Sequence, residues 1–143
     1  MTGPTTAEEW RDLHDRATAL VEQTALDPAT IAQTLHHLSM LALELTDYIG
    51  REKTGLLALA SDAEQDFDAR KAKLIDDLLG DGFPLTRARE RASHSLRDYR
   101  RAAESAKLAA DYAKGVLASV NRRHFELMNV GKHVDSAIGG RRG

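Results

Sequence analysis

The sequence predicts an all-α protein: a long antiparallel helical hairpin of the coiled-coil type, preceded by a short N-terminal helix. Three observations lead to this fold class. Apolar residues recur at alternating steps of three and four, the spacing that gathers them on one stripe of a helix. Only 3 of the 143 residues are proline, and 29% are charged. Aromatic residues make up only 5%, which favours thin helical seams over a thick globular core.

The N-terminal segment, residues 1–26, is predicted to hold one short helix behind a disordered lead. Thr6 and Glu9 have the spacing of a capping box, in which hydroxyl and carboxylate satisfy backbone N–H groups reciprocally. Apolar residues then follow at helical spacing, so we expect a helix over residues 7–25.

Residues 27–138 are predicted to form the hairpin. Its first long helix begins at Asp27 and Pro28, since aspartate is a good N-cap and proline suits the first helical position. Gly50 and Gly55 mark a place where this helix could kink or break. The turn of the hairpin is predicted at 80–84, where two glycines end one helix and a proline precedes the next.

The second long helix carries the most regular pattern in the chain. Eight positions at a strict seven-residue interval, from Leu85 to Val134, are all apolar or aromatic, as in a heptad repeat. The other helices cover this stripe only in part, so we expect the chain to self-associate along it. Residues 139–143 follow as a predicted disordered basic tail. The predicted seam residues are Leu96, Tyr99, Ala103, Ala106, Ala110, Ala113, Leu117, Val120 and Leu127.

Charge is divided unevenly along the chain. Through Phe83 there are 7 Lys or Arg against 16 Asp or Glu, a balance of −9, and from Pro84 onward 13 against 6, a balance of +7. The two halves could pair with each other, or the basic half could bind nucleic acid through its phosphates. The residues available for phosphate contacts are Arg97, Arg100, Arg101, Lys107, Lys114, Arg122 and Arg123.

Pairing of the two halves predicts a register for the hairpin. With the turn at its centre, residue i of the first long helix stands level with residue 163 − i of the second. Asp66 is then level with Arg97, and Asp62 with Arg101. Such exposed pairs are each worth under about 1 kcal/mol and set register more than stability. If the two carboxylates point away while these arginines and Arg100 form an open patch, nucleic-acid binding is favoured over an adaptor role.

No catalytic, cofactor-binding or metal site is predicted, and the chain is not expected to be an enzyme. Glu90, His94 and Asp98 share one helix face, but metal sites in helical bundles draw ligands from several helices, so we interpret them as an exposed strip. Arg89 and His94 superficially resemble the short Arg…His motif of HEPN ribonucleases, from which Glu90 departs. The histidines interpreted as packing residues on or beside the seams are His36, His37 and His124.

The stretch from Asp98 to Lys132, with its Tyr/Ala-rich middle and its Asn-Arg-Arg segment near the end, resembles a loose class of small phage proteins. These helical, coil-rich proteins are often encoded in recombination and replication gene clusters. The resemblance covers roughly residues 65–138 and leaves out the N-terminal helix. It implies a non-enzymatic phage accessory role.

Three functions stay open. The first is a self-associating helical adaptor that acts as a phage accessory factor, with an unidentified protein partner. The second is a nucleic-acid-binding accessory protein, and the third is a phage inhibitor of a host defence system. The chain has no cysteine, no apolar run near the roughly 18–20 residues of a membrane span and no signal-peptide core. We therefore expect a soluble cytoplasmic protein that binds no membrane, no cofactor and no small-molecule substrate.

Overall fold

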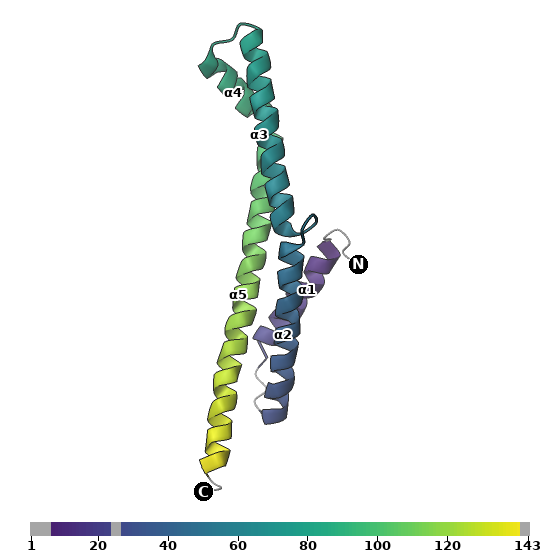
Figure 1. Ribbon diagram of the computed structural model, residues 1–143, viewed down its shortest axis with the longest axis vertical. Coiled ribbons are helices and arrows are strands. Elements are labelled where there is room, and N and C mark those ends of the chain that lie inside the picture. Colours follow the sequence, from purple (N-terminus) through teal and green to yellow (C-terminus); the bar gives the residue numbers. More distant parts are fainter. Residues whose placement is uncertain (1–6, 24–26, 141–143) are drawn as a thin grey trace. The chain divides into compact units, whose positions relative to one another are not determined.

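The computed structural model describes residues 7–23 and 27–140, with side chains described as far as Lys132. Within these residues the chain forms helices and no strand, which confirms the all-α class (Figure 1). None of these helices is both long and apolar enough to cross a lipid bilayer. The expectations for residues 1–6, 24–26 and 141–143 lie outside the described residues. The predicted disordered tail began too early, because Gly139 and Gly140 still belong to the last helix. The helices are α1 (Ala7–Val21), α2 (Pro28–Gly50), α3 (Leu56–Gly80), α4 (Leu85–Ser95) and α5 (Arg97–Gly140).

The chain divides into two compact units. Unit 1 comprises Gly50–Asp111, and unit 2 is formed by Gly3–Ile49 together with Tyr112–Gly143. The helix α5 therefore contributes residues to both units. This division differs from the single hairpin over 27–138, because the boundary falls at the interruption between α2 and α3.

The first long helix is broken, which is the alternative that Gly50 and Gly55 left open. α2 ends at Gly50, and residues 51–55 form a turn before α3 begins at Leu56. Glycine is a poor helix former because it loses the most backbone freedom on folding, and two glycines flank the interruption. The break lies at the place that Gly50 and Gly55 marked in the sequence.

The second long helix is also interrupted, at Leu96. The backbone there has φ −102° and ψ 19°, and its N–H group bonds the carbonyls of both Ala92 and His94. The preceding residues, Ser93 to Ser95, contain two serines, whose side chains compete with helical hydrogen bonds. The heptad pattern did not predict this kink, because the pattern shows only which positions are apolar.

Two predicted helix ends are confirmed. Asp27 caps α2 by accepting hydrogen bonds from the Thr30 N–H group at 2.9 Å and the Thr30 hydroxyl at 2.6 Å, and these bonds lower the pKa of Asp27. At the end of α3, the Phe83 N–H group bonds Leu78 and the Gly82 N–H group bonds Leu79. This Schellman motif needs a left-handed residue, which Gly82 supplies with φ 91°. By contrast, α1 ends at Val21 and not at residue 25.

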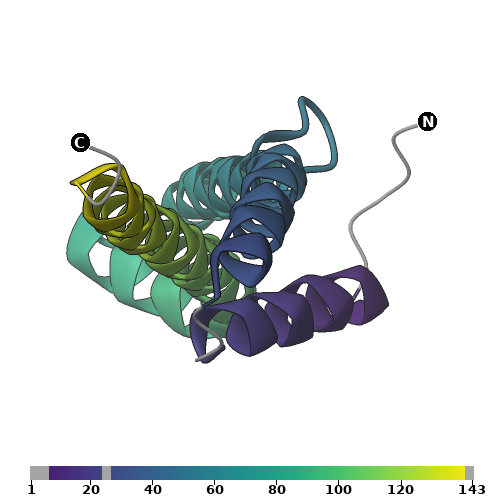
Figure 2. The same ribbon diagram turned by 90° about the horizontal axis from the view of Figure 1, so that it is seen from below.

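Unit 2 is a three-helix bundle of α1, α2 and the part of α5 after Asp111. Viewed along the bundle, the three helices stand at the corners of a triangle (Figure 2). The centre holds Leu38, Leu41 and Leu45 of α2, all fully buried. The other buried apolar residues of unit 2 are Leu13, Ala17, Ile31, Tyr48, Ile49, Ala113, Val120 and Leu127.

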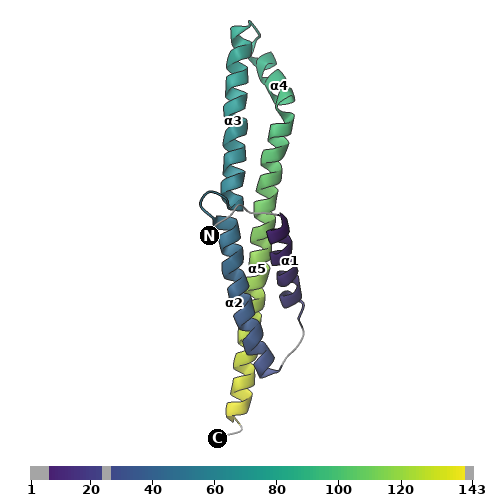
Figure 3. The ribbon, with the colours of Figure 1, turned by 90° about the vertical axis from the view of Figure 1, so that its right-hand side faces the viewer.

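Unit 1 has a much thinner interior. α4 packs beside the C-terminal end of α3 (Figures 1 and 3). The buried apolar residues of this unit are alanines: Ala88, Ala92 and Ala110. No residue of α3 is buried, and Phe67 and Leu74 of its apolar stripe are only half-buried.

Candidate interaction surfaces

An aromatic cluster joins the three helices of unit 2. Trp10 stacks on Tyr48 with ring centroids 5.8 Å apart and meets the edge of Tyr112 at 5.9 Å. The His14 Nε2 atom lies 3.3 Å from the Tyr112 hydroxyl, within hydrogen-bond distance. Because aromatic pairs add to the area that they bury, this cluster fixes α1 on α2 and α5.

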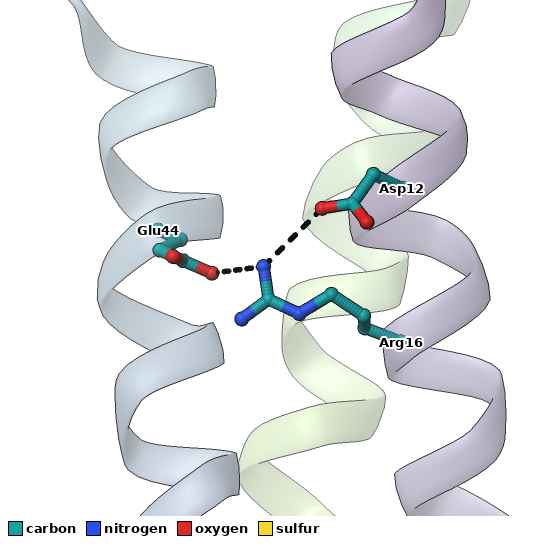
Figure 4. A network of polar contacts seen from close by, with 3 residues as sticks. All are labelled: Asp12, Arg16 and Glu44. Carbon is teal, nitrogen blue, oxygen red and sulfur yellow. Dashed lines mark hydrogen bonds and ion pairs between the residues drawn. The ribbon is translucent and has the colours of Figure 1, made fainter.

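Arg16 adds a polar contact between α1 and α2. Its guanidinium lies between Asp12 of the same helix, at 3.3 Å, and Glu44 of α2, at 2.5 Å (Figure 4). Partial burial alone would lower the pKa of Arg16, but the bonds to both carboxylates outweigh it and raise that pKa. All three side chains stay substantially exposed, so this network is worth under about 1 kcal/mol per pair.

Arg123 was predicted as a nucleic-acid contact, and the structure gives it another role. Its side chain is 21% exposed and donates a hydrogen bond to the Gln23 carbonyl after α1. The Gln23 side chain in turn accepts a bond from the buried Thr34 hydroxyl. Arg123 therefore ties α5 to the end of α1 and is not available to phosphate.

Most of the predicted seam residues are buried or half-buried. Ala110, Ala113, Val120 and Leu127 are buried, whereas Tyr99 is 40% exposed. In unit 2 this stripe is covered by the chain's own helices, so it offers no surface to a second copy. A charge at Val120 would disrupt the bundle itself and cannot test self-association. The half-buried seam residues are Leu96, Ala103, Ala106 and Leu117.

The other predicted basic residues are exposed and divided between the two units. Arg97, Arg100, Arg101 and Lys107 belong to unit 1, and Lys114 and Arg122 belong to unit 2.

The predicted ion pairs across unit 1 are not formed. Asp66 bonds Arg70 of its own helix at 3.0 Å, and Arg100 pairs with Glu104 of its own helix at 3.6 Å. Within the described residues Arg97 and Arg101 have no hydrogen-bond or ion-pair partner, and both are exposed. The self-pairing of the charged halves in this register is therefore wrong for unit 1.

The register itself is shifted. The Arg70 guanidinium lies 4.4 Å from the centre of the Tyr99 ring, so facing residue numbers sum to 169 there and not to 163. Figure 1 shows α4 inclined to α3. Because α4 is inclined and the chain is kinked at Leu96, more residues of α4 and α5 are needed to run along a given length of α3 than a straight helix would need. This difference accounts for the shift in register. In unit 2, Ser39 and His124 are hydrogen-bonded at 3.0 Å, and their numbers sum to the expected 163.

An open groove runs between α2 and α5 in unit 2. It has a volume of about 330 Å³. Leu43 on one wall is 67% exposed, and Phe125, one turn beyond Asn121 of the other wall, is 64% exposed. The heptad pattern did not single out Leu43 or Phe125, because neither is at a seam position. The signal that could have found them is an apolar residue on the outward face of a helix. The residues that line this α2–α5 groove are Leu38, Ser39, Ala42, Leu43, Thr46, Asn121 and His124.

The histidines differ in their surroundings. His124 is half-buried and bonds the Ser39 hydroxyl, consistent with a packing residue. His36 and His37 are exposed on α2, so their interpretation as packing residues was wrong. His37 lines a second groove, of about 380 Å³, between α1 and α2, together with Met40.

The remaining chemical candidates do not converge. Glu90 and His94 are on α4, but Asp98 is on α5 beyond the kink, so the three do not share one continuous helix. No group of three or more His, Asp or Glu within the described residues is arranged to hold a metal ion. Arg89 and His94 are both exposed.

Comparison of the chain with protein-family models, with curated proteins and with solved structures finds no match. A function for this all-α protein therefore has to come from the surfaces described above.

Proposed function

We propose that this chain is a non-enzymatic helical interaction protein that self-associates. One observation carries the proposal: the described residues expose more large apolar side chains than they bury. Among the described residues, twelve large hydrophobic side chains are exposed, whereas nine that are larger than alanine are buried. Exposed apolar side chains that gather on one surface are typical of interaction sites, and a second helical chain is a natural cover for them.

Unit 1 supports the same proposal. Its buried apolar residues are alanines, so it excludes little apolar area from water per residue. Helical units of this size need tight packing or a partner to be stable. The phage accessory role that the resemblance over residues 65–138 implies is part of this proposal.

We expect the full chain to form a dimer or a higher oligomer at micromolar concentration. Sedimentation velocity over a series of concentrations measures this directly, because the sedimentation coefficient rises as monomers associate. A single compact monomer at every concentration would contradict the proposal.

A second candidate, nucleic-acid binding by unit 1, is favoured by the two unpaired arginines. Arg97 and Arg101 are exposed without a partner among the described residues, and Arg87 and Arg89 are exposed on the adjoining α4. Nucleic-acid binding would rank first if Arg97, Arg100 and Arg101 formed one open patch. That condition is met only in part, because Arg100 pairs with Glu104.

This candidate predicts binding that weakens steeply with salt. Each phosphate contact contributes about 0.9 to the slope of log K against log salt on duplex DNA, so Arg97→Ala with Arg101→Ala should reduce that slope by about 2. Fluorescence anisotropy with a labelled duplex at several salt concentrations measures the slope. Arg122→Ala, an exposed arginine of unit 2, is the matched control. No binding at low salt, or an unchanged slope in the double variant, would exclude these arginines as contacts.

A further inference from the structure

We propose that unit 1 binds unit 1 of a second copy face to face, around a twofold axis parallel to its helices, so that the two units form a four-helix bundle. The inference rests on the proposed self-association and adds the face and the symmetry. Three observations carry it: the thin interior of unit 1, the opposite charges that stand free on one of its faces, and the level of these charges along the helices.

The seam of unit 1 is covered only in part. Its buried apolar residues are alanines of α4 and α5, and Leu57 and Leu79 of α3 are 43% and 40% exposed. A pair of helices leaves such residues in water, whereas a second pair laid over it buries them. The seam residues of α3, all half-buried, are Leu56, Ala60, Ala63, Phe67, Leu74 and Leu78.

One face of unit 1 is formed by the residues that directly follow the seam, and we call it face A. One residue turns about 100° around a helix. Because α3 runs opposite to α4 and α5, residues one position after the seam lie on the same side of the pair. On α3, the residues of face A are Leu57, Ser61, Glu64, Asp68, Ile75 and Leu79. On α4 and α5 they are Arg89, Ser93, Arg97, Arg100, Glu104, Lys107 and Asp111.

Face A has opposite charges on its two sides. Its α3 side has two acids, Glu64 and Asp68, and no base, whereas its α4–α5 side has four bases and two acids. Within the described residues Glu64, Asp68 and Lys107 are exposed and have no hydrogen-bond or ion-pair partner. Arg100 and Glu104 pair with each other at 3.6 Å, so they do not change this balance.

The opposite face of unit 1, formed by the residues directly before the seam, is less complementary. Its only charge on α5 is Asp98, which has the same sign as the three aspartates that this face carries on α3. Its two bases, Arg87 and Arg91, are confined to α4, and Arg91 lies over the Phe83 ring at 5.2 Å. Charge therefore favours face A for the contact.

The charges also select one symmetry. A twofold axis parallel to the helices lays α3 of each copy on α4 and α5 of the other, so the acidic side meets the basic side. A twofold axis across the helices would lay α3 on α3, so like charges would face each other. The parallel axis also makes each facing helix pair antiparallel, as in a four-helix bundle.

The register places one charged pair at this interface. The Arg70 guanidinium lies over the Tyr99 ring, so residues of α3 and α5 whose numbers sum to 169 stand at one level. Glu64 is then level with residue 105, two residues or about 3 Å of helix rise from Lys107. A twofold axis parallel to the helices preserves levels. Glu64 of each copy therefore faces Lys107 of the other, and the pair occurs twice.

The first test reverses the acidic side of face A. We expect the full chain carrying Glu64→Lys and Asp68→Lys to have a dimer Kd raised at least about tenfold, because bases then face bases in both halves of the interface. Sedimentation equilibrium measures Kd, and circular dichroism confirms that these exposed substitutions leave the helices intact. Asp62→Lys is the matched control, since Asp62 is an exposed acid of the same helix on the opposite face. Tighter association of the double variant would mean that α3 faces α3 and would overturn the parallel axis.

The second test reads the pair between copies. Glu64→Lys alone puts two lysines together at each contact, and Lys107→Glu alone puts two glutamates together, so each variant should associate more weakly than wild type. In an equal mixture, a mixed dimer has a lysine facing a glutamate at both contacts. We expect the mixed dimer to be favoured at least about tenfold over either variant's own dimer. A pair made within one chain cannot give this recovery, so a mixture as weak as its components would overturn the assignment.

The outcomes separate this inference from the function on which it rests. A wild-type chain that is monomeric at tens of micromolar contradicts the proposed self-association, and the assignment of face A fails with it. A wild-type oligomer that Glu64→Lys with Asp68→Lys leaves unchanged, or that Asp62→Lys weakens equally, contradicts only the assignment of face A. In that case self-association stands and another surface of the chain carries it.

Discussion

Replacing Leu38 by alanine is expected to lower the free energy of unfolding of unit 2 by about 2–5 kcal/mol. Leu38 is fully buried at the centre of the three-helix bundle. Its loss removes apolar burial and leaves a cavity that fixed helices cannot close fully. Because the bundle is small, a loss of this size is a large fraction of its stability.

Urea unfolding followed by Trp10 fluorescence measures this effect in unit 2 alone. Trp10 is the only tryptophan in the chain, and it stacks on Tyr48 inside that unit. Met40→Ala on the same helix is the control and should change stability by no more than about 0.5 kcal/mol, since Met40 is 47% exposed. Equal effects of the two substitutions would show that α2 is rotated from its described orientation.

The second large effect concerns the close approach of helices at an alanine. Ala113 is fully buried on α5, so Ala113→Leu should overpack the bundle and destabilise it by about 1–3 kcal/mol. Ala109, one turn earlier on the same helix, is exposed. Ala109→Leu should be nearly neutral, because leucine is almost as good a helix former as alanine.

Thermal unfolding of both leucine variants by circular dichroism gives the comparison, with Trp10 emission reporting on unit 2. An unchanged melting temperature for Ala113→Leu would mean that no helix lies against this face of α5. A drop for Ala109→Leu as large as that for Ala113→Leu would show that Ala109 also lies against a neighbouring helix and is not exposed.

The sequence alone was enough to determine the helical class and several helix ends. Apolar spacing near 3.5 residues is a property of each segment by itself, and it correctly located the buried stripe at Ala113, Val120 and Leu127. Asp27 and Gly82 act through their own backbone neighbours, so their effect does not depend on distant parts of the chain. Such local features are predictable because the physics that produces them is local.

Only the tertiary structure decided the register and the surfaces. A heptad repeat looks nearly the same after a shift of seven residues, and unit 1 is shifted by six relative to the predicted pairing. Alanines at the contact make neighbouring registers similar in apolar packing, so the inclination of α4 and the kink at Leu96 determine which one forms. The charges did not decide it, since Asp66 and Arg100 found partners one turn away on their own helices, where no loop entropy opposes pairing. The exposure of Leu43 and Phe125 likewise depends on which helices α1, α2 and α5 place around them, and this is a property of the packed bundle that no single segment contains.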